Sequence, residues 1–325
     1  MTTPNQQHPG RARRTHARAH RLVLAAVFAG LAAVALAGCS ETSASVSGSS
    51  TAPAASAPSA LAVIEEDSAV EVAAREQAWA DKQAREAAVA AAAQAATTAQ
   101  AELDQAVAAL EAKGTSVSYI VMNITTGATI EHNADTVYYS ASSIKGPYCV
   151  SLVREHGAQA RESYGNVIRA CLVNSSNSDY DTLREAYKRE RFFQNFGSEA
   201  GTSADLSHWY TNYTVRDLVK LWSLADSWLA AGSEDAVWVG ELLSDTLYSQ
   251  VDDIAGGDGI VTWSKAGWYP GGDRDAVTFD GGAVHTQTGD YVIAVAVDRG
   301  SDFKAVRSIM EPLVALYEAQ AVQQS

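Results

Sequence analysis

The sequence contains little of what metal, phosphate or nucleic-acid sites require. It has three Cys in 325 residues, and no group of Cys and His has zinc-site spacing. No glycine-rich phosphate-binding loop is present. Basic residues are also scarce, because 24 Lys and Arg stand against 38 Asp and Glu, giving a formal net charge of -14. An acidic surface repels phosphate backbones. We therefore expect no nucleic-acid partner, no metal and no cofactor.

Long apolar runs are scarce too, and the most prominent lies near the N-terminus. Leu22 to Ala37 follows five Arg residues, and the first 38 positions contain no acidic residue. The run is shorter than the roughly 20 residues that a membrane-spanning helix needs. This pattern predicts a signal peptide over residues 1–38.

The end of the apolar run, Leu36-Ala37-Gly38-Cys39, resembles the bacterial lipobox. The resemblance implies cleavage before Cys39 and lipidation of its thiol. We therefore expect an exported lipoprotein, anchored at the extracytoplasmic face of a bacterial membrane. Two alternatives remain, a cleaved secretory peptide with an incidental Cys and a retained membrane span.

Two segments of low complexity follow. Residues 39–60 are rich in Ser, Ala, Thr and Pro and predict a flexible tether. Residues 61–113 are rich in Ala, Glu, Gln, Lys and Arg and contain neither Pro nor Gly, which predicts a long helix ended by Gly114. Its large apolar residues are too few for a strong coiled-coil seam. A spacer helix is favoured, and self-association or the recruitment of a partner helix stays open.

Residues 115–325 predict a compact α+β domain. Strands are expected at 116–123, 128–131, 259–265, 276–285 and 291–298, and helices at 144–155, 179–193, 215–231 and 304–321. Strands at both ends with helices between them predict an antiparallel sheet in which N- and C-terminal strands pair.

The first candidate catalytic motif is Ser142-Ser143-Ile144-Lys145, at the start of a predicted helix. Residues i and i+3 share a helix face, so the Lys amine can reach the Ser hydroxyl. Burial would lower the Lys pKa and let the amine accept the Ser proton. A second Ser-x-x-Lys, at residues 301–304, follows the last strand with nothing downstream to complete a site, and we interpret it as a chance match.

Two further motifs follow in order. Ser175-Ser176-Asn177 precedes a predicted helix, and Lys265-Ala266-Gly267 lies on a predicted strand. Ser-x-x-Lys, Ser-x-Asn and Lys-[Thr/Ser]-Gly in this order are the signature of the β-lactamase and penicillin-binding superfamily. From about residue 116 to 321 the sequence thus resembles class A β-lactamases and D-Ala-D-Ala peptidases.

The resemblance implies a role for each motif residue. Ser142 would be the acylated nucleophile and Lys145 its proton acceptor. Ser175 would relay a proton to the leaving nitrogen, and Asn177 would orient Lys145 and the substrate amide. Lys265 would bind the substrate carboxylate. The backbone N–H groups of Ser142 and Trp268 would form the oxyanion hole.

The other two cysteines lie close to these motifs. Cys149 is seven residues after Ser142, and Cys171 is four residues before Ser175. An even pair in an exported protein suggests a disulfide, and some class A enzymes have one that joins the same two helices. We expect a Cys149–Cys171 bridge, with two buried free thiols as the alternative.

The sequence departs from the family in two respects. Ala266 replaces the Thr or Ser whose hydroxyl helps to bind the substrate carboxylate. The segment from Phe196 to Tyr213 lacks the Glu-x-x-x-Asn pattern whose Glu activates the deacylating water, and its one Glu, Glu199, is a weak candidate. An acyl-enzyme should therefore persist.

Three alternative site assignments weigh less. Tyr210-Thr211-Asn212 could replace the Ser175 motif, as a Tyr-x-Asn does in class C relatives. His285 could belong to a Ser-His-Asp triad, but no Gly-x-Ser-x-Gly surrounds Ser142. The acidic, glycine-rich segment 252–259 is interpreted as a polar turn, because its spacing does not fit a Ca²⁺ loop.

Together these features predict a surface-anchored serine acyl hydrolase that acts through an acyl-Ser142 intermediate. Its expected substrate is a peptidoglycan-type D-amino acid peptide or a β-lactam. The alternative is a catalytically weak or inactive module of the same fold that binds cell-wall peptide or a partner protein.

Overall fold

The computed structural model describes residues 60–324, with side chains described from residue 69 onward. The predicted signal peptide, the Cys39 lipidation site and the tether up to residue 59 lie outside these residues. The chain divides into two units, Met1–Ala91 and Ala92–Ser325. No helix among the described residues is long and apolar enough to cross a membrane.

The long predicted helix is present as α2, Ala60–Glu111. It ends at a turn in which Gly114 has a positive φ of 74°, a conformation that favours glycine. Ala99, Leu103 and Val107 are buried against strands of the sheet and the C-terminal helix. The compact unit therefore begins at Ala92, within the helix, and not at residue 115.

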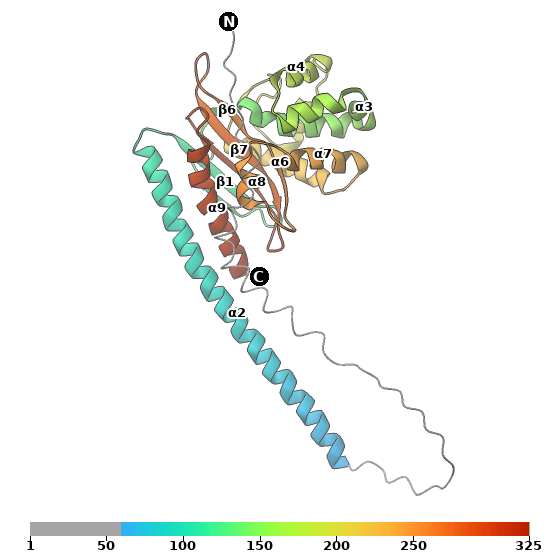
Figure 1. The fold of residues 1–325 in the computed structure, drawn as a ribbon, viewed down its shortest axis with the longest axis vertical. Coiled ribbons are helices and arrows are strands. Elements are labelled where there is room, and N and C mark those ends of the chain that lie inside the picture. The colour runs from blue at the N-terminus through green and yellow to red at the C-terminus, as the bar shows by residue number, and fades with distance from the viewer. Residues whose placement is uncertain (1–59, 325) are drawn as a thin grey trace, which may run out of the picture. The chain divides into compact units, whose positions relative to one another are not determined.

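The sheet is antiparallel, as predicted, and joins the two ends of the domain (Figure 1). Its strands are β1 Val117–Asn123, β2 Thr129–His132, β5 Val261–Ser264, β6 Gly267–Tyr269, β7 Val277–His285 and β8 Tyr291–Val297. The order is β2-β1-β8-β7-β5, and β6 also pairs with β7. Ile120 of β1 lies opposite Ala294 of β8, so the N- and C-terminal strands form the centre of the sheet.

Both faces of the sheet are covered. β8 is buried along its whole length, and its side chains alternate between two hydrophobic cores, as the two-residue period of a strand requires. Ala294 and its even-numbered neighbours face the first core, and Ile293 and Val295 face the second. The first core lies under helices α3 to α7, and α9 packs on the second (Figure 1).

The helical layer carries the first two motifs. Its elements are β3 Tyr138–Tyr139, the 3-10 turn η1 Ala141–Ile144, α3 Lys145–Val173, α4 Asn177–Ala186, α5 Phe192–Ala200, β4 Asn212–Tyr213, α6 Val215–Leu229 and α7 Glu234–Ser244. On the other face lie α8 Gln250–Ala255 and α9 Phe303–Gln324. Thr214 caps α6 through a reciprocal capping box with Asp217, which explains the sharp helix start at Val215.

Several elements differ from the sequence-based expectations. The helix expected at 179–193 is divided into α4 and α5. α3 runs much further than residue 155 and is kinked at Gly157, where φ is 50° and ψ is -131°. α7 was not predicted, and the turn expected at 252–259 begins as the short helix α8. Ser249 caps α8 by accepting a hydrogen bond from the backbone N–H of Val251.

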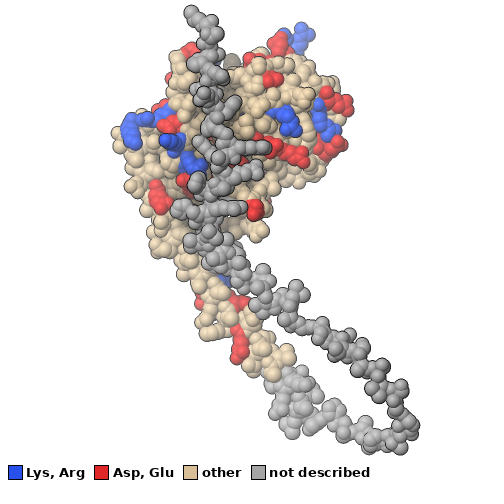
Figure 2. Space-filling view, in the orientation of Figure 1, with Lys and Arg blue, Asp and Glu red and all other residues tan. Residues whose placement is uncertain are grey.

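Charged residues of both signs lie beside one another on the surface in view (Figure 2). Arg216 forms ion pairs with Glu131 at 2.8 Å and Asp135 at 2.7 Å. These pairs join α6 to the edge strand β2 and the segment after it, and they neutralise part of the acidic excess locally.

One charged cluster joins the β7–β8 hairpin to α6. His285 Nε2 lies 2.7 Å from Asp226 Oδ1, and His285 Nδ1 lies 3.1 Å from Asp290 Oδ2. The hydrogen bond with the buried Asp226 is the main cause that raises the His285 pKa, and Asp290 adds to it. Both carboxylates therefore favour the protonated form of His285 at this hairpin.

We predict that substituting His285→Gln flattens the pH dependence of stability. A raised folded-state pKa means that the His285 contribution is complete below its ordinary pKa of about 6.5 and is lost as pH rises through the folded-state value. Urea unfolding from pH 5 to 9 should show a wild-type advantage on the order of 1 kcal/mol at the acid end only. His208→Gln, on an exposed loop, is the control. An equal loss of stability at every pH would contradict the assignment.

Candidate active site

Ser142 lies in a tightly held turn between β3 and α3. Ala141, directly before it, has a positive φ of 45°, a conformation that costs a non-glycine residue roughly 1 kcal/mol. The Ser143 hydroxyl donates to the backbone carbonyl of Ser140 and is hydrogen-bonded to the Tyr213 hydroxyl of β4. These contacts bury Ser143 and leave Ser142 partly exposed. Tyr213 and Ser143 were not predicted as site residues.

Lys145 is completely buried beneath this turn. Its ammonium group donates to Ser175 O at 2.8 Å, Ser176 O at 3.3 Å and Asn177 Oδ1 at 2.6 Å. These three acceptors match the three protons of an ammonium group. Burial lowers the Lys145 pKa from its ordinary value. Lys145 is thus attached to the second motif, as the predicted role of Asn177 requires.

Ser175 connects the two lysines. Its φ of 58° lies in the left-handed region, which turns the chain sharply between α3 and α4. The backbone carbonyl of Ser175 accepts from Lys145, and its hydroxyl accepts from Lys265 Nζ at 3.1 Å. The structure therefore brings the three sequence motifs together around one serine.

Lys265 lies between β5 and β6, and both strands pair with β7 in the same register. Its backbone N–H donates to Gly281 O, and Ser264 and Gly267 lie opposite Gly282 and Phe279 without an offset. The ammonium group is buried and also donates to Ala266 O at 3.0 Å. Burial, followed by the nearby Lys145 charge, lowers the Lys265 pKa to about 8.

The backbone of β6 lies directly against the Ser142 turn at Gly267. A Cβ atom at this position would stand 2.2 Å from Ser143 N and 2.7 Å from Ser142 N. Only glycine permits so close an approach. The next residue, Trp268, packs its indole ring between Tyr248 and Phe303, with ring centroids at 4.9 and 5.2 Å, and so anchors the strand. Ala266 is buried and offers no hydroxyl.

Asp280 is a buried carboxylate of this region that was not predicted as a site residue. It lies in the otherwise uncharged part of β7 and accepts from Gly281 N–H, the Ser249 hydroxyl and Gln250 N–H. Burial raises the Asp280 pKa to about 7. In the sequence, Asp280 is the one acidic residue of a predicted apolar strand, and this feature could have identified it as a candidate.

Cys149 and Cys171 face each other in the first core. Both are buried free thiols, with their sulfur atoms 3.8 Å apart. Two parts of α3, one on each side of the Gly157 kink, bring them together. The predicted neighbours thus meet, but no disulfide is formed in this structure, and the bridge itself stays a prediction.

The weaker alternatives fall in different places. The Tyr210 hydroxyl donates to Asn177 Oδ1 at 3.3 Å, so Tyr210 supports the Ser175 motif and does not contact Lys145 in its place. Glu199 forms a surface ion pair with Arg154 at 2.8 Å. His285 is held by two carboxylates at the far end of β7, in an arrangement that uses both ring nitrogens.

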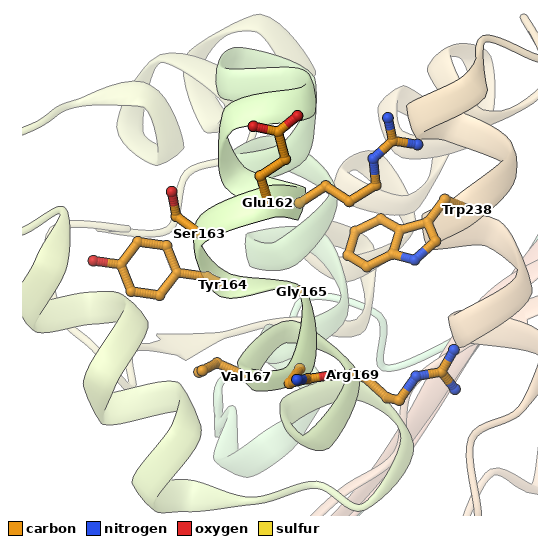
Figure 3. A pocket seen from close by; sticks show the side chains of 9 residues that line it. Glu162, Ser163, Tyr164, Gly165, Val167, Arg169 and Trp238 are labelled. Atoms are coloured by element: carbon orange, nitrogen blue, oxygen red, sulfur yellow. The ribbon is translucent and has the colours of Figure 1, made fainter.

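A surface pocket of about 490 Å³ between α3 and α7 contains none of the motif residues (Figure 3). Trp238 and Arg169 line it, and Arg161 at its edge is paired with Glu234 at 2.7 Å. Gly165 faces Trp238 with ordinary contact space.

We predict that Gly267→Ala destabilises the domain by about 1–3 kcal/mol, the usual effect of overpacking. The added methyl group must displace either β6 or the backbone of the Ser142 turn. Urea unfolding measures the change. Gly165→Ala is the matched control, because its Cβ would meet Trp238 at 3.6 Å and should be tolerated. Equal stability of the Gly267→Ala protein and the wild type would show that the close approach is not a constraint.

The sequence matches no protein-family model. It also matches no curated protein. Solved structures, in contrast, are similar over almost their whole length. The β-lactamase from Sphaerobacter thermophilus DSM 20745 is 21% identical, with a TM-score of 0.54 over 69% of this chain and 98% of that one. A class A β-lactamase from Bacteroides cellulosilyticus DSM 14838 is 15% identical, with a TM-score of 0.55 over 70% and 99%.

A mutant of PBP-A, solved as an acyl-enzyme complex with penicillin G, is 17% identical, with a TM-score of 0.52 over 68% of this chain and 96% of that one. At these identities the likeness concerns the fold. The compact unit therefore has the fold shared by class A β-lactamases and PBP-A, the fold of the serine β-lactamase and penicillin-binding superfamily.

Proposed function

We propose that this chain is a serine acyl hydrolase of the β-lactamase and penicillin-binding type, with Ser142 as the acylated nucleophile. The proposal rests on the hydrogen bonds that join the three sequence motifs. Lys145 donates to Ser175 O and Asn177 Oδ1, and Lys265 donates to the Ser175 hydroxyl. The three motifs thus supply two buried amines, those of Lys145 and Lys265, and the hydroxyl of Ser175 that can relay a proton. The partly exposed Ser142 belongs to the same motif as Lys145.

Each residue then has a defined step. Lys145, after losing a proton, accepts the proton of the Ser142 hydroxyl as this oxygen attacks the substrate carbonyl carbon. The backbone N–H groups of Ser142 and Trp268 bind the oxyanion that develops on the carbonyl oxygen. The Ser175 hydroxyl, polarised by Lys265, gives its proton to the leaving nitrogen and is restored by Lys145. Lys265 binds the substrate carboxylate as a cation.

Deacylation would be slow. It requires a base that activates water on the acyl-enzyme, and the Glu-x-x-x-Asn segment is missing. Glu199, the candidate in that segment, is paired with Arg154. A long-lived acyl-enzyme suits a peptidase or a penicillin-binding protein better than a fast β-lactamase. We propose a peptidoglycan-type D-amino acid peptide or a β-lactam as substrate. The protein would encounter it at the outer face of a membrane, to which lipidated Cys39 would anchor the chain.

Two observations favour a second candidate, a noncatalytic module that binds cell-wall peptide. All three Lys145 protons have acceptors other than Ser142, and Ala266 lacks the hydroxyl of the usual third motif. Such a module would bind penicillin reversibly without a covalent adduct.

We predict a stable covalent adduct between the full chain, purified in detergent, and a fluorescent penicillin. Intact-mass measurement should show one added molecule, which should be absent from Ser142→Ala because the nucleophile is gone. Ser301→Ala, in the second Ser-x-x-Lys, is the matched control and should acylate normally. An adduct that survives in Ser142→Ala would refute the assigned nucleophile. Saturable binding without any adduct or β-lactam consumption would favour the binding module.

A further inference from the structure

Three tyrosines form a wall beside the candidate active site. We call Tyr139 of β3, Tyr210 of the loop before β4 and Tyr269 of β6 the tyrosine wall. The Tyr139 ring centroid lies 6.1 Å from that of Tyr210 and 5.5 Å from that of Tyr269. All three side chains are partly exposed. Aromatic side chains that are grouped and left partly open commonly mark a contact surface for a ligand.

The wall adjoins the groups that would hold an acyl donor. The Tyr210 hydroxyl donates to Asn177 Oδ1, the same atom that accepts from Lys145. Tyr269 directly follows Trp268, and Tyr139 is three residues before Ser142. The wall thus runs from Asn177, through Tyr139, to β6, which packs against the Ser142 turn. The acyl side chain would therefore lie along the tyrosine wall.

Arg274, in the loop between β6 and β7, holds a positive charge at this wall. Its guanidinium carbon lies 5.1 Å from the Tyr139 ring centroid. A guanidinium stacked on a ring keeps the N–H groups of its edge available for a carboxylate. The neighbouring Asp273 accepts a hydrogen bond from the Tyr269 hydroxyl. No ion pair joins Arg274 to a carboxylate within the described part of the chain.

Arg274 also lines an open pocket of about 510 Å³ together with Tyr210 and Asn212. The carboxylates there are engaged: Asp217 accepts from Thr202, Ser203 and Thr214, and Asp205 lies 3.4 Å from His208. Arg274 is the Lys or Arg side chain that this pocket offers to an anion.

We propose that the site selects acyl donors whose side chain is an apolar or aromatic group ending in a carboxylate. The tyrosine wall packs against the apolar part, and Arg274 pairs with the terminal carboxylate. This specificity rests on the proposed acyl transfer to Ser142. The carboxylate in question belongs to the acyl side chain and is separate from the one assigned to Lys265.

The test uses two penicillins that differ only in the carboxylate at the end of the acyl side chain, benzylpenicillin and its 4-carboxybenzyl analogue. Second-order rate constants for acylation of the full chain are measured by intact mass. The wild type should acylate about 2–5-fold faster with the carboxylated probe at low salt, as expected for an exposed ion pair. Arg274→Gln should remove the preference and Arg274→Glu should reverse it. Salt should weaken the wild-type preference.

The matched control is Arg169→Glu, which makes the same charge change at the pocket between α3 and α7 (Figure 3). It should leave both rates and their ratio unchanged. An unchanged ratio in Arg274→Glu, or an equal loss with both probes, would overturn the role of Arg274 while leaving the nucleophile in place. Failure of both probes to acylate the wild type would instead overturn the proposed function, and the specificity with it.

Discussion

The candidate site depends on two buried lysines that have no carboxylate partner. Lys145 and Lys265 are almost completely inaccessible to solvent. Within the part of the chain that the structure describes, no carboxylate lies within ion-pair distance of either ammonium group. Neutral oxygens hold them instead: two carbonyls, one amide and the Ser175 hydroxyl among them. Burying a charge without a counterion destabilises a fold, and the proposed catalytic role would give a reason for this arrangement.

The two lysines also influence each other. Two cations near one hydroxyl disfavour full protonation of the pair, and the charge of Lys145 helps to lower the Lys265 pKa to about 8. The buried pair is therefore easier to deprotonate than two solvent-exposed lysines. The backbone around the two lysines is held in a strained conformation, because Ala141 and Ser175 both have positive φ angles and are not glycine. Gly267 then brings β6 against the Ser142 turn.

Much of this arrangement could be predicted from the sequence, because short motifs and strand patterns depend on local residue types. The α+β class and the antiparallel pairing of β1 with β8 were both expected and are present. The contact between the Ser142 helix and the second motif followed from a family resemblance, and the hydrogen bonds of Lys145 agree with it.

Other features depend on tertiary contacts that no local pattern reveals. α8 looked like a polar turn because of its acidic residues and the glycines after it, yet Asp280, thirty residues away, accepts a hydrogen bond at its first turn. The domain boundary within α2 depends on three small or medium apolar residues that pack on a distant strand and helix. The tyrosine wall combines three segments that are separated in sequence by about seventy and sixty residues.

The most direct test of the account is the stability of Lys265→Met, measured by urea unfolding alongside penicillin acylation. If Lys265 is a buried charge kept for chemistry, the variant should be as stable as the wild type or more stable by about 1–3 kcal/mol at pH 7. Acylation should be lost. The stability difference should shrink as pH rises above about 8, because the folded wild type then contains a neutral Lys265. A Lys265→Met protein that is clearly less stable at pH 7, with acylation retained, would contradict the account.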